Sequence, residues 1–179
     1  MEFPAARIRA LVPSPKKTNS TMVKLLSKKQ TRLHEAEDGF SGIIQIPVDS
    51  KELEATWVMP AEAEGIVLLA PGSGSSRHSK RNQFVASKLV EAGLGTVLLD
   101  LLTNDEESDD LADGRYRFDI DFLTDRLIAA THWVRSHPRS NHCRIGFFGA
   151  STGGAAALWA AAILGDEISA VVSRGGRPD

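Results

Sequence analysis

The chain of 179 residues has a single cysteine and few aromatic side chains, which make up 6% of the total. Cys143 has no second cysteine with which to form an internal disulfide, which is compatible with a reducing compartment, so we expect a cytoplasmic protein. No apolar run approaches the roughly 20 residues that span a bilayer, which predicts no transmembrane helix. The net charge of −2 provides no overall field that would attract nucleic acid. Together these features argue against a disulfide scaffold, a membrane-spanning protein and a nucleic-acid binder.

Acidic residues are nearly missing from the first 32 positions, where eight Lys and Arg residues stand against one acid, Glu2. This basic segment contains several Ser and Thr residues and no steady apolar period. It is typical of an organelle-targeting segment, of a disordered tail, or of upstream sequence if Met22 is the true start. We favour a basic, disordered extension over residues 1–39, followed by one domain over residues 40–179.

Strand and helix patterns alternate from residue 42 onward. Gly42 to Val48 and Glu52 to Met59 alternate in polarity around a short turn, which predicts an antiparallel hairpin. Continuous apolar runs predict buried strands over residues 65–70, 96–101, 143–148 and 168–173, and periodic patterns predict helices over residues 80–92, 123–134 and 154–164. This order predicts an α/β fold with a mostly parallel sheet, helices on both faces and an N-terminal antiparallel hairpin.

One segment between these elements is strongly acidic, from Asp105 to Asp110. It lacks the spacing of oxygen ligands that defines a calcium-binding loop. We interpret it as a solvated, mobile loop.

The most informative motif is Gly149-Ala150-Ser151-Thr152-Gly153, which lies between an apolar strand and an Ala-rich helix. The spacing G-x-S-x-G in a strand–turn–helix context is typical of a nucleophile elbow. A serine at the first turn of a helix meets N–H groups without acceptors and the positive end of the helix dipole, which favour a developing oxyanion. We therefore predict that Ser151 is a nucleophile that attacks an ester or lactone carbonyl. The alternative is a Gly/Ser turn without chemistry.

Residues 42–179 resemble the α/β-hydrolase superfamily, specifically its dienelactone-hydrolase-like branch. The resemblance rests on residues 71–79 (Pro-Gly-Ser-Gly-Ser-Ser-Arg-His-Ser), residues 149–153 and residues 173–179 (Ser-Arg-Gly-Gly-Arg-Pro-Asp). It implies a hydrolase that forms an acyl-enzyme and needs no cofactor, with backbone oxyanion donors at Thr152 and Ser73. Dienelactone hydrolases proper carry a cysteine nucleophile, where this chain has Ser151.

No histidine follows Ser151 in the sequence, although the superfamily orders its triad as nucleophile, acid and histidine. A serine hydroxyl is a weak nucleophile without a base to accept its proton. The sequence is therefore either a fragment of a longer hydrolase, which we favour, or a product without the usual base. A non-catalytic hydrolase-like module is an alternative function. His78 is a candidate replacement base, because its loop should border the elbow.

Three side chains are candidate substrate-binding residues: Arg77, His78 and Arg174. They lie in loops expected near the C-terminal edge of the sheet, where open α/β sheets bind ligands. The guanidinium group of Arg suits a carboxylate or phosphate, which predicts a small and anionic ester or lactone as substrate. The alternative is that these arginines pair with nearby acids at the surface.

Two further alternatives involve other ligands. Gly72-Ser73-Gly74 follows a buried strand and Asp100 ends the next strand, which is similar to a dinucleotide fingerprint. Arg77 occupies the third glycine position, however, so nucleotide binding is the weaker hypothesis. His132, His137 and His142 recur every five residues, which does not place them on one helix face, and we predict no metal site.

Overall fold

The computed structural model describes residues 34–36 and 39–176, so the predictions for residues 1–33 lie outside the described part of the chain. A seven-stranded sheet has the strand order β1-β2-β3-β5-β4-β6-β7. The strands are β1 (His34–Ala36), β2 (Gly39–Val48), β3 (Lys51–Pro60), β4 (Gly65–Ala70), β5 (Gly95–Leu99), β6 (Arg144–Ala150) and β7 (Ile168–Arg174). The helices are α2 (Lys80–Glu91), α3 (Asn104–Asp113), α4 (Ile120–Ser136) and α5 (Thr152–Leu164), with a short 3₁₀ turn over Gly165–Glu167.

The antiparallel entry to the sheet is confirmed. β2 and β3 pair along their whole length, from Gly39 opposite Pro60 to Val48 opposite Lys51. Leu53, Ala55 and Trp57 alternate with more exposed residues along β3 and point into the core. The sheet also includes β1, which pairs with β2, so it begins within the segment predicted to be an N-terminal extension.

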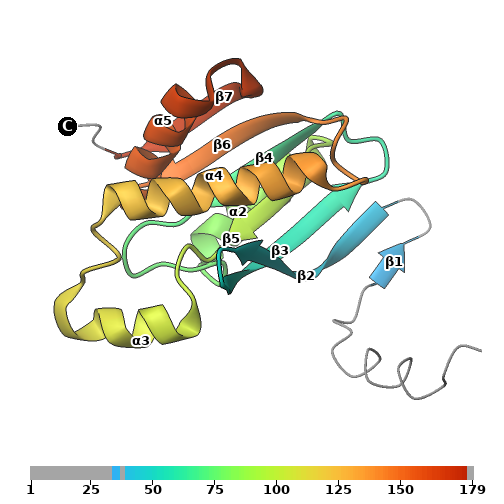
Figure 1. Cartoon of the computed structure of the whole chain (residues 1–179). Helices are drawn as coiled ribbons and strands as arrows, with labels where there is room; N and C mark the ends of the chain where they lie inside the picture. Colours follow the sequence, from blue (N-terminus) through green and yellow to red (C-terminus); the bar gives the residue numbers. More distant parts are fainter. Residues whose placement is uncertain (1–33, 37–38, 177–179) are drawn as a thin grey trace, which may run out of the picture. The chain divides into compact units, whose positions relative to one another are not determined.

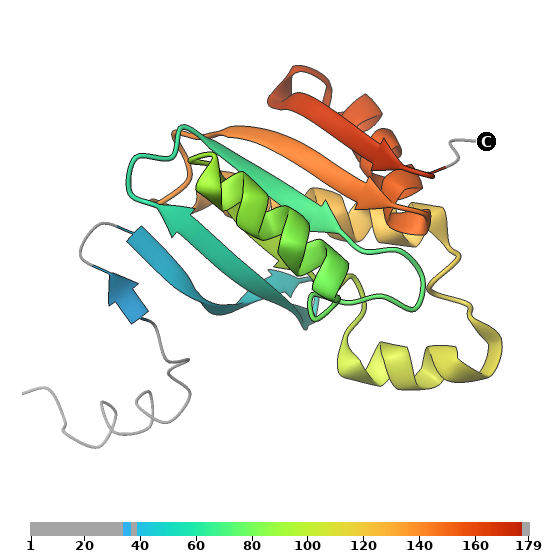
Figure 2. The ribbon, with the colours of Figure 1, turned by 180° about the vertical axis from the view of Figure 1, so that it is seen from behind.

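The other half of the sheet is parallel and has helices on both faces. β5, β4, β6 and β7 run in the same direction, and β3 joins β5 in antiparallel orientation. α4 and α5 lie together on one face (Figure 1), and α2 lies on the opposite face (Figure 2). This arrangement confirms the predicted α/β architecture, because a helix that follows a strand must cross over one face before the next parallel strand.

The main core lies between the sheet and the α4–α5 layer. Leu127, Ala130 and Val134 of α4 are fully buried against strands that contribute Trp57 and Phe147. A smaller cluster lies under α2, where Ala86 packs with Leu69 of β4 and Leu98 of β5. The two clusters hold the middle of the sheet rigid, so the strand ends that carry the polar loops are fixed in position.

The acidic segment is not a loop, which corrects the interpretation of residues 105–110. These residues form most of α3, which begins with a capping box: the Thr103 hydroxyl accepts the Glu106 N–H at 3.3 Å and the Glu106 carboxylate accepts the Thr103 N–H at 2.9 Å. Glu106 is buried and pairs with Lys51 and Arg126 at 2.7 and 2.8 Å. The segment is ordered because these contacts satisfy charges that would otherwise require solvent.

Within the part of the chain that the structure describes, no helix is both long enough and apolar enough to cross a bilayer. Cys143 directly precedes β6, where its thiol donates to the Ala63 carbonyl at 3.1 Å. Burial raises the pKa of this thiol. A raised pKa keeps the sulfur protonated, so Cys143 has the character of a packing residue rather than a nucleophile.

Candidate active site

Ser151 occupies a strained turn between β6 and α5. Its backbone has φ of 51° and ψ of −124°, a conformation that L-residues rarely adopt. Its N–H donates to the Arg174 carbonyl at 3.1 Å, and its own carbonyl accepts the N–H groups of Gly154 and Ala155. The residue is exposed and lies at the C-terminal end of β6. A residue held in such a conformation by surrounding hydrogen bonds is typical of a functional site.

Glycines on both sides of Ser151 make this turn possible. A Cβ atom on Gly149 would lie 2.3 Å from the Gly153 carbonyl oxygen, and one on Gly153 would lie 2.2 Å from the Pro71 carbonyl oxygen. Side chains therefore cannot be accommodated at either position without movement of the backbone. The turn has the close approach that the G-x-S-x-G spacing predicts, and it packs directly on the segment that follows β4.

The loop after β4 borders the elbow, as expected from the order of the strands. Gly72 lies against the turn so closely that a Cβ atom there would be 2.7 Å from the Ala150 carbonyl oxygen and 3.0 Å from the Ser151 Cβ. The Ser73 N–H donates to the Thr152 Oγ1 at 2.9 Å. The two predicted oxyanion donors, the N–H groups of Thr152 and Ser73, are thus on adjacent segments. In this structure the acceptor of the Ser73 N–H is the Thr152 hydroxyl oxygen.

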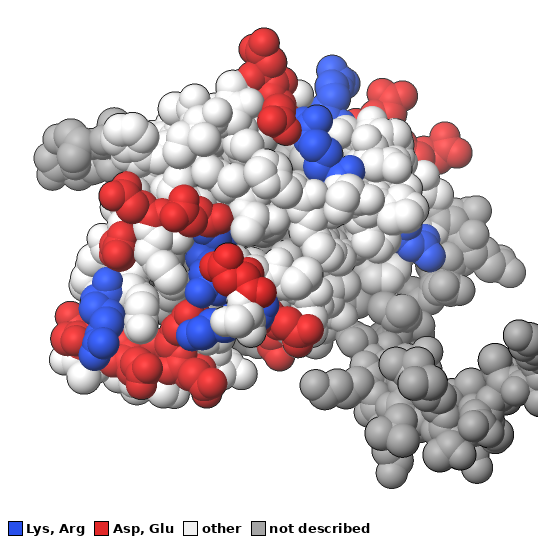
Figure 3. All heavy atoms as spheres, in the orientation of Figure 1, with Lys and Arg blue, Asp and Glu red and all other residues white. Residues whose placement is uncertain are grey.

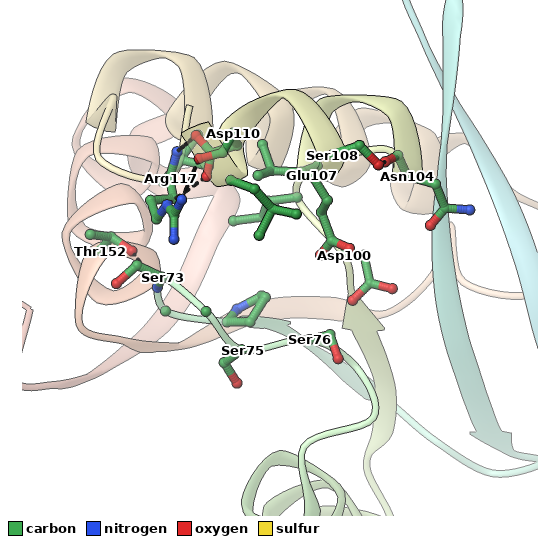
Figure 4. A pocket seen from close by; sticks show the side chains of 17 residues that line it. Ser73, Ser75, Ser76, Asp100, Asn104, Glu107, Ser108, Asp110, Arg117 and Thr152 are labelled. Carbon is green, nitrogen blue, oxygen red and sulfur yellow. Dashed lines mark hydrogen bonds and ion pairs between the residues drawn. The ribbon is translucent and has the colours of Figure 1, made fainter. Parts of the chain in front are cut away.

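A pocket of about 490 Å³ opens beside these residues. Its lining comes from residues 71–76, from residues 100–102 after β5, from one side of α3, and from Arg117, Leu123 and Thr152. Figure 4 shows Ser73 and Thr152 together on one side of the pocket, with Asp110 and Arg117 above them and Glu107 and Asp100 farther along. Ser151 is not a lining residue, so the pocket begins at its immediate neighbour.

The Arg77 side chain is held by two carboxylates. Its Nη1 and Nη2 atoms form ion pairs with Asp100 and Glu54, and its N–H donates to the Asp100 carboxylate at 2.7 Å. Only 10% of the side chain is exposed. This arrangement favours the structural role for Arg77 that the sequence left open. The ion pair with Arg77 also occupies the carboxylate of Asp100, which is the acid that would bind a ribose in a dinucleotide site.

The other two predicted substrate-binding residues are exposed. His78 lies in the same loop as Arg77, its N–H donates to the Ser76 hydroxyl at 3.2 Å, and it is not among the residues that line the pocket. Arg174 ends β7, where its carbonyl accepts the Ser151 N–H and its side chain is exposed. Of the three candidates, Arg174 is the one whose backbone contacts the elbow directly.

Within residues 39–176, the remaining histidines do not come together as a group. His132 and His142 are exposed, whereas the His137 ring packs edge-on against Trp57 with ring centres 4.7 Å apart. Burial, together with the positive charge of Arg139, lowers the pKa of His137. Within residues 39–176, no group of three or more His, Cys, Asp or Glu side chains could hold a metal ion.

Sequence reasoning missed the contribution of α3 to the pocket. Asp110 is buried, pairs with the Arg117 guanidinium and accepts the N–H groups of Tyr116 and Arg117 at 2.7 and 3.1 Å. Glu107 lies one helical turn earlier and also lines the pocket. The signal for this helix was present in the sequence as Thr103-Asn104-Asp105-Glu106, a capping-box pattern.

Comparison with protein families gives a match at the C-terminal end of the chain. A family model described as "BAAT / Acyl-CoA thioester hydrolase C terminal" matches residues 127–177, a stretch that includes the C-terminal part of α4, the elbow and β7. The part of this stretch before β6 contributes Leu127, Ala130 and Val134 to the main core, and the Ser151 turn directly follows β6.

Similar proteins include a dienelactone hydrolase from Anabaena variabilis, with 50% sequence identity and a TM-score of 0.76 over 79% of this chain and 65% of that chain. A protein from Mycobacterium tuberculosis named "Putative phosphoribosyl transferase" is 51% identical over 124 residues, which are 68% of this chain and 26% of that protein. Est1E from Butyrivibrio proteoclasticus is 22% identical with a TM-score of 0.61, over 73% of this chain and 49% of Est1E. The matched part of the chain spans about a quarter of the length of the Mycobacterium tuberculosis protein.

Proposed function

Because this chain has the α/β-hydrolase fold of the dienelactone-hydrolase-like type, we propose that it is a hydrolase that cleaves small carboxylic esters or lactones through Ser151. The observation that carries this proposal is the exposed Ser151 on a backbone with φ of 51°, at the N-cap of α5 and next to a pocket. The names of the similar dienelactone hydrolase and of the matching thioester-hydrolase family both describe cleavage at an acyl carbon, which supports the choice of bond.

In the proposed reaction, the Ser151 Oγ attacks the carbonyl carbon of the substrate and loses its proton to a base. The carbonyl oxygen becomes an oxyanion next to the N-terminus of α5. The tetrahedral intermediate then expels an alkoxide, which takes up a proton, and leaves an acyl group on Ser151. Water hydrolyses this acyl-enzyme, releases the carboxylic acid and restores the serine hydroxyl.

The oxyanion would be stabilised by backbone donors. The Thr152 N–H belongs to the first turn of α5, whose N–H groups have no acceptor within the helix. The Ser73 N–H is the proposed second donor. The Thr152 Oγ1 accepts this N–H at 2.9 Å and holds the loop after β4 beside the elbow, and the oxyanion would be a second acceptor for the same N–H.

The base is the unassigned part of the mechanism. Within residues 39–176, the hydrogen bonds that histidines make do not include the Ser151 hydroxyl. This observation favours a second candidate function, a hydrolase-like module without turnover. That the substrate is anionic stays a prediction. It now depends on Arg174, because the guanidinium group of Arg77 pairs with Glu54 and Asp100.

Turnover of small neutral esters and lactones tests the proposal. We expect Ser151→Ala to lower kcat by at least about a thousandfold, because the nucleophile is removed. Ser169→Ala is the matched control, since Ser169 is an exposed serine on β7, and it should retain the activity of the original chain. Equal activity of Ser151→Ala and the original chain would contradict the role of Ser151, and inactivity of all three would favour the module.

A further inference from the structure

β7 forms an open edge of the sheet. It is the last strand in the order and pairs with β6, and within the described residues no strand pairs with its other side. An unpaired edge presents N–H and C=O groups that a further strand can bind. The seven residues of β7 include neither proline nor lysine, two residues that commonly protect such edges. The backbone of β7 is therefore able to accept another strand.

Apolar side chains are exposed on both sides of this edge. On one face of the sheet, α5 has no polar side chain over residues 153–164, yet Trp159 and Ile163 are 48% and 63% exposed. Figure 3 shows few charged side chains over α5, in contrast to the many acidic ones over α3. On the other face, Val172 is 53% exposed, because α2 lies over β4 and β5 rather than over β7 (Figure 2). A helix that is apolar all round is normally covered, and exposed apolar patches of this kind mark interaction sites.

The sequence of β7 is complementary to itself in antiparallel pairing. When two β7 strands pair about Val171, Ser169 lies opposite Ser173, Ala170 lies opposite Val172, and the two Val171 side chains meet. Each side chain then faces one of similar size and polarity on the same face of the sheet. The same two-fold axis places the α5 helices of the two copies on one face, where their exposed apolar side chains can pack together. Such an interface closes with two copies.

The two ends of β7 carry opposite charges. Asp166 and Glu167 precede the strand, and Arg174 ends it. Glu167 pairs with Arg135 at 3.1 Å, whereas the side chains of Asp166 and Arg174 are exposed and form no hydrogen bond or ion pair with the described residues. In antiparallel pairing about Val171, Arg174 of one copy lies near the start of the other copy's β7, within reach of Asp166 there. Symmetry makes this contact twice, so the charges favour a second copy as the occupant of the edge.

We propose that a second copy of this chain binds the β7 edge. The two sheets join through antiparallel β7 strands, Trp159 and Ile163 of both copies are covered, and Arg174 of each copy pairs with Asp166 of the other. This interface does not depend on the proposed hydrolase function, but it adjoins the elbow, because the Ser151 N–H donates to the Arg174 carbonyl. Asp166 of the second copy and an anionic substrate would be alternative partners of the Arg174 guanidinium group.

Sedimentation equilibrium of the full chain at low ionic strength tests the proposal. We expect the average mass to rise with concentration from 19.3 kDa toward twice that value. Arg174→Asp and Asp166→Arg should each raise the dissociation constant of the dimer at least about fivefold, because two exposed ion pairs become repulsive. An equimolar mixture of the two variants should associate as tightly as the original chain, since each reversed charge then meets its opposite. Asp109→Arg is the matched control, because Asp109 is an exposed acid on α3, away from β7 (Figure 1), and it should leave the dimer unchanged.

Three results would overturn the proposal: a monomer at every concentration, an average mass that rises beyond the dimer, or a mixture of the two variants that associates no better than either variant alone. Recovery in the mixture also excludes misfolding as the cause of weak association, because a misfolded chain would not regain a specific partner. The measurement involves no turnover, so its outcome is separate from that of the tests of the hydrolase function.

Discussion

The Ser73 N–H donates a hydrogen bond to the Thr152 Oγ1 at 2.9 Å, across 79 positions of the chain. This bond joins the loop after β4 to the residue that follows the proposed nucleophile. It links the two segments that carry the proposed oxyanion donors, the N–H groups of Ser73 and Thr152. We therefore expect the Thr152 side chain to position this loop beside the proposed nucleophile.

Replacement of Thr152 by Val tests this positioning role. Val keeps the shape of the side chain but removes the acceptor, so the loop after β4 loses its link to the elbow. We expect kcat/KM for a neutral ester to fall at least about tenfold, which corresponds to a hydrogen bond of roughly 1.4 kcal/mol. Thr152→Ser keeps the hydroxyl and should restore most of the activity. A Thr152→Val variant with undiminished kcat/KM would contradict the role of this bond.

Replacement of Gly149 by Ala tests the tight packing of the elbow. The new Cβ atom would lie 2.3 Å from the Gly153 carbonyl oxygen, so the backbone must move. We expect the free energy of unfolding to fall by about 3 kcal/mol or more, measured by urea denaturation. Gly146→Ala is the control within the same strand, because its nearest atom, the Ala170 carbonyl oxygen, would be 3.3 Å away. Similar losses for both variants would argue against a specially constrained turn.

The buried Glu106 predicts a pH dependence of stability. Burial opposes ionisation, but the hydrogen bonds from Lys51 and Thr103 and the charge of Arg126 outweigh it and hold the pKa of Glu106 below its ordinary value of 4.5. A carboxyl group with a lowered pKa in the folded state contributes stability above the unfolded pKa. That contribution is lost as the pH falls below about 4.5 through the folded pKa.

Replacement of Glu106 by Gln measures this contribution. At pH 7 we expect the free energy of unfolding to fall by about 3 kcal/mol, because Arg126 is left buried without its partner. The difference between the original chain and the variant should shrink as the pH is lowered below 4.5. A difference that stays constant with pH would show that the charge of Glu106 does not carry the effect.

The elbow was predictable from the sequence because its determinants are local. Gly149, Ser151 and Gly153 lie within five positions, and the strand and helix on either side have clear apolar patterns. α3 was not predicted because its apolar content is low and its order depends on long-range pairs, such as that between Lys51 and Glu106. Hydrophobic periodicity does not detect a helix of this kind, although the capping-box spacing does.

The substrate-binding residues were harder to predict for a related reason. The position of Arg77 in its loop suggested a ligand-binding role, but its partners Glu54 and Asp100 come from β3 and from the end of β5. Their proximity arises only when the antiparallel and parallel parts of the sheet join. Glu106 and Asp110 were not distinguished within the acidic run for the same reason, since only the fold brings Arg126 and Arg117 to them.

The central claim is that Ser151 is a nucleophile, and covalent labelling tests it most directly. The full chain is incubated with a fluorophosphonate probe, digested, and analysed by mass spectrometry. The account predicts a single phosphonylated peptide modified at Ser151 and no label in Ser151→Ala. An unlabelled chain, or a label that persists in Ser151→Ala, would contradict it.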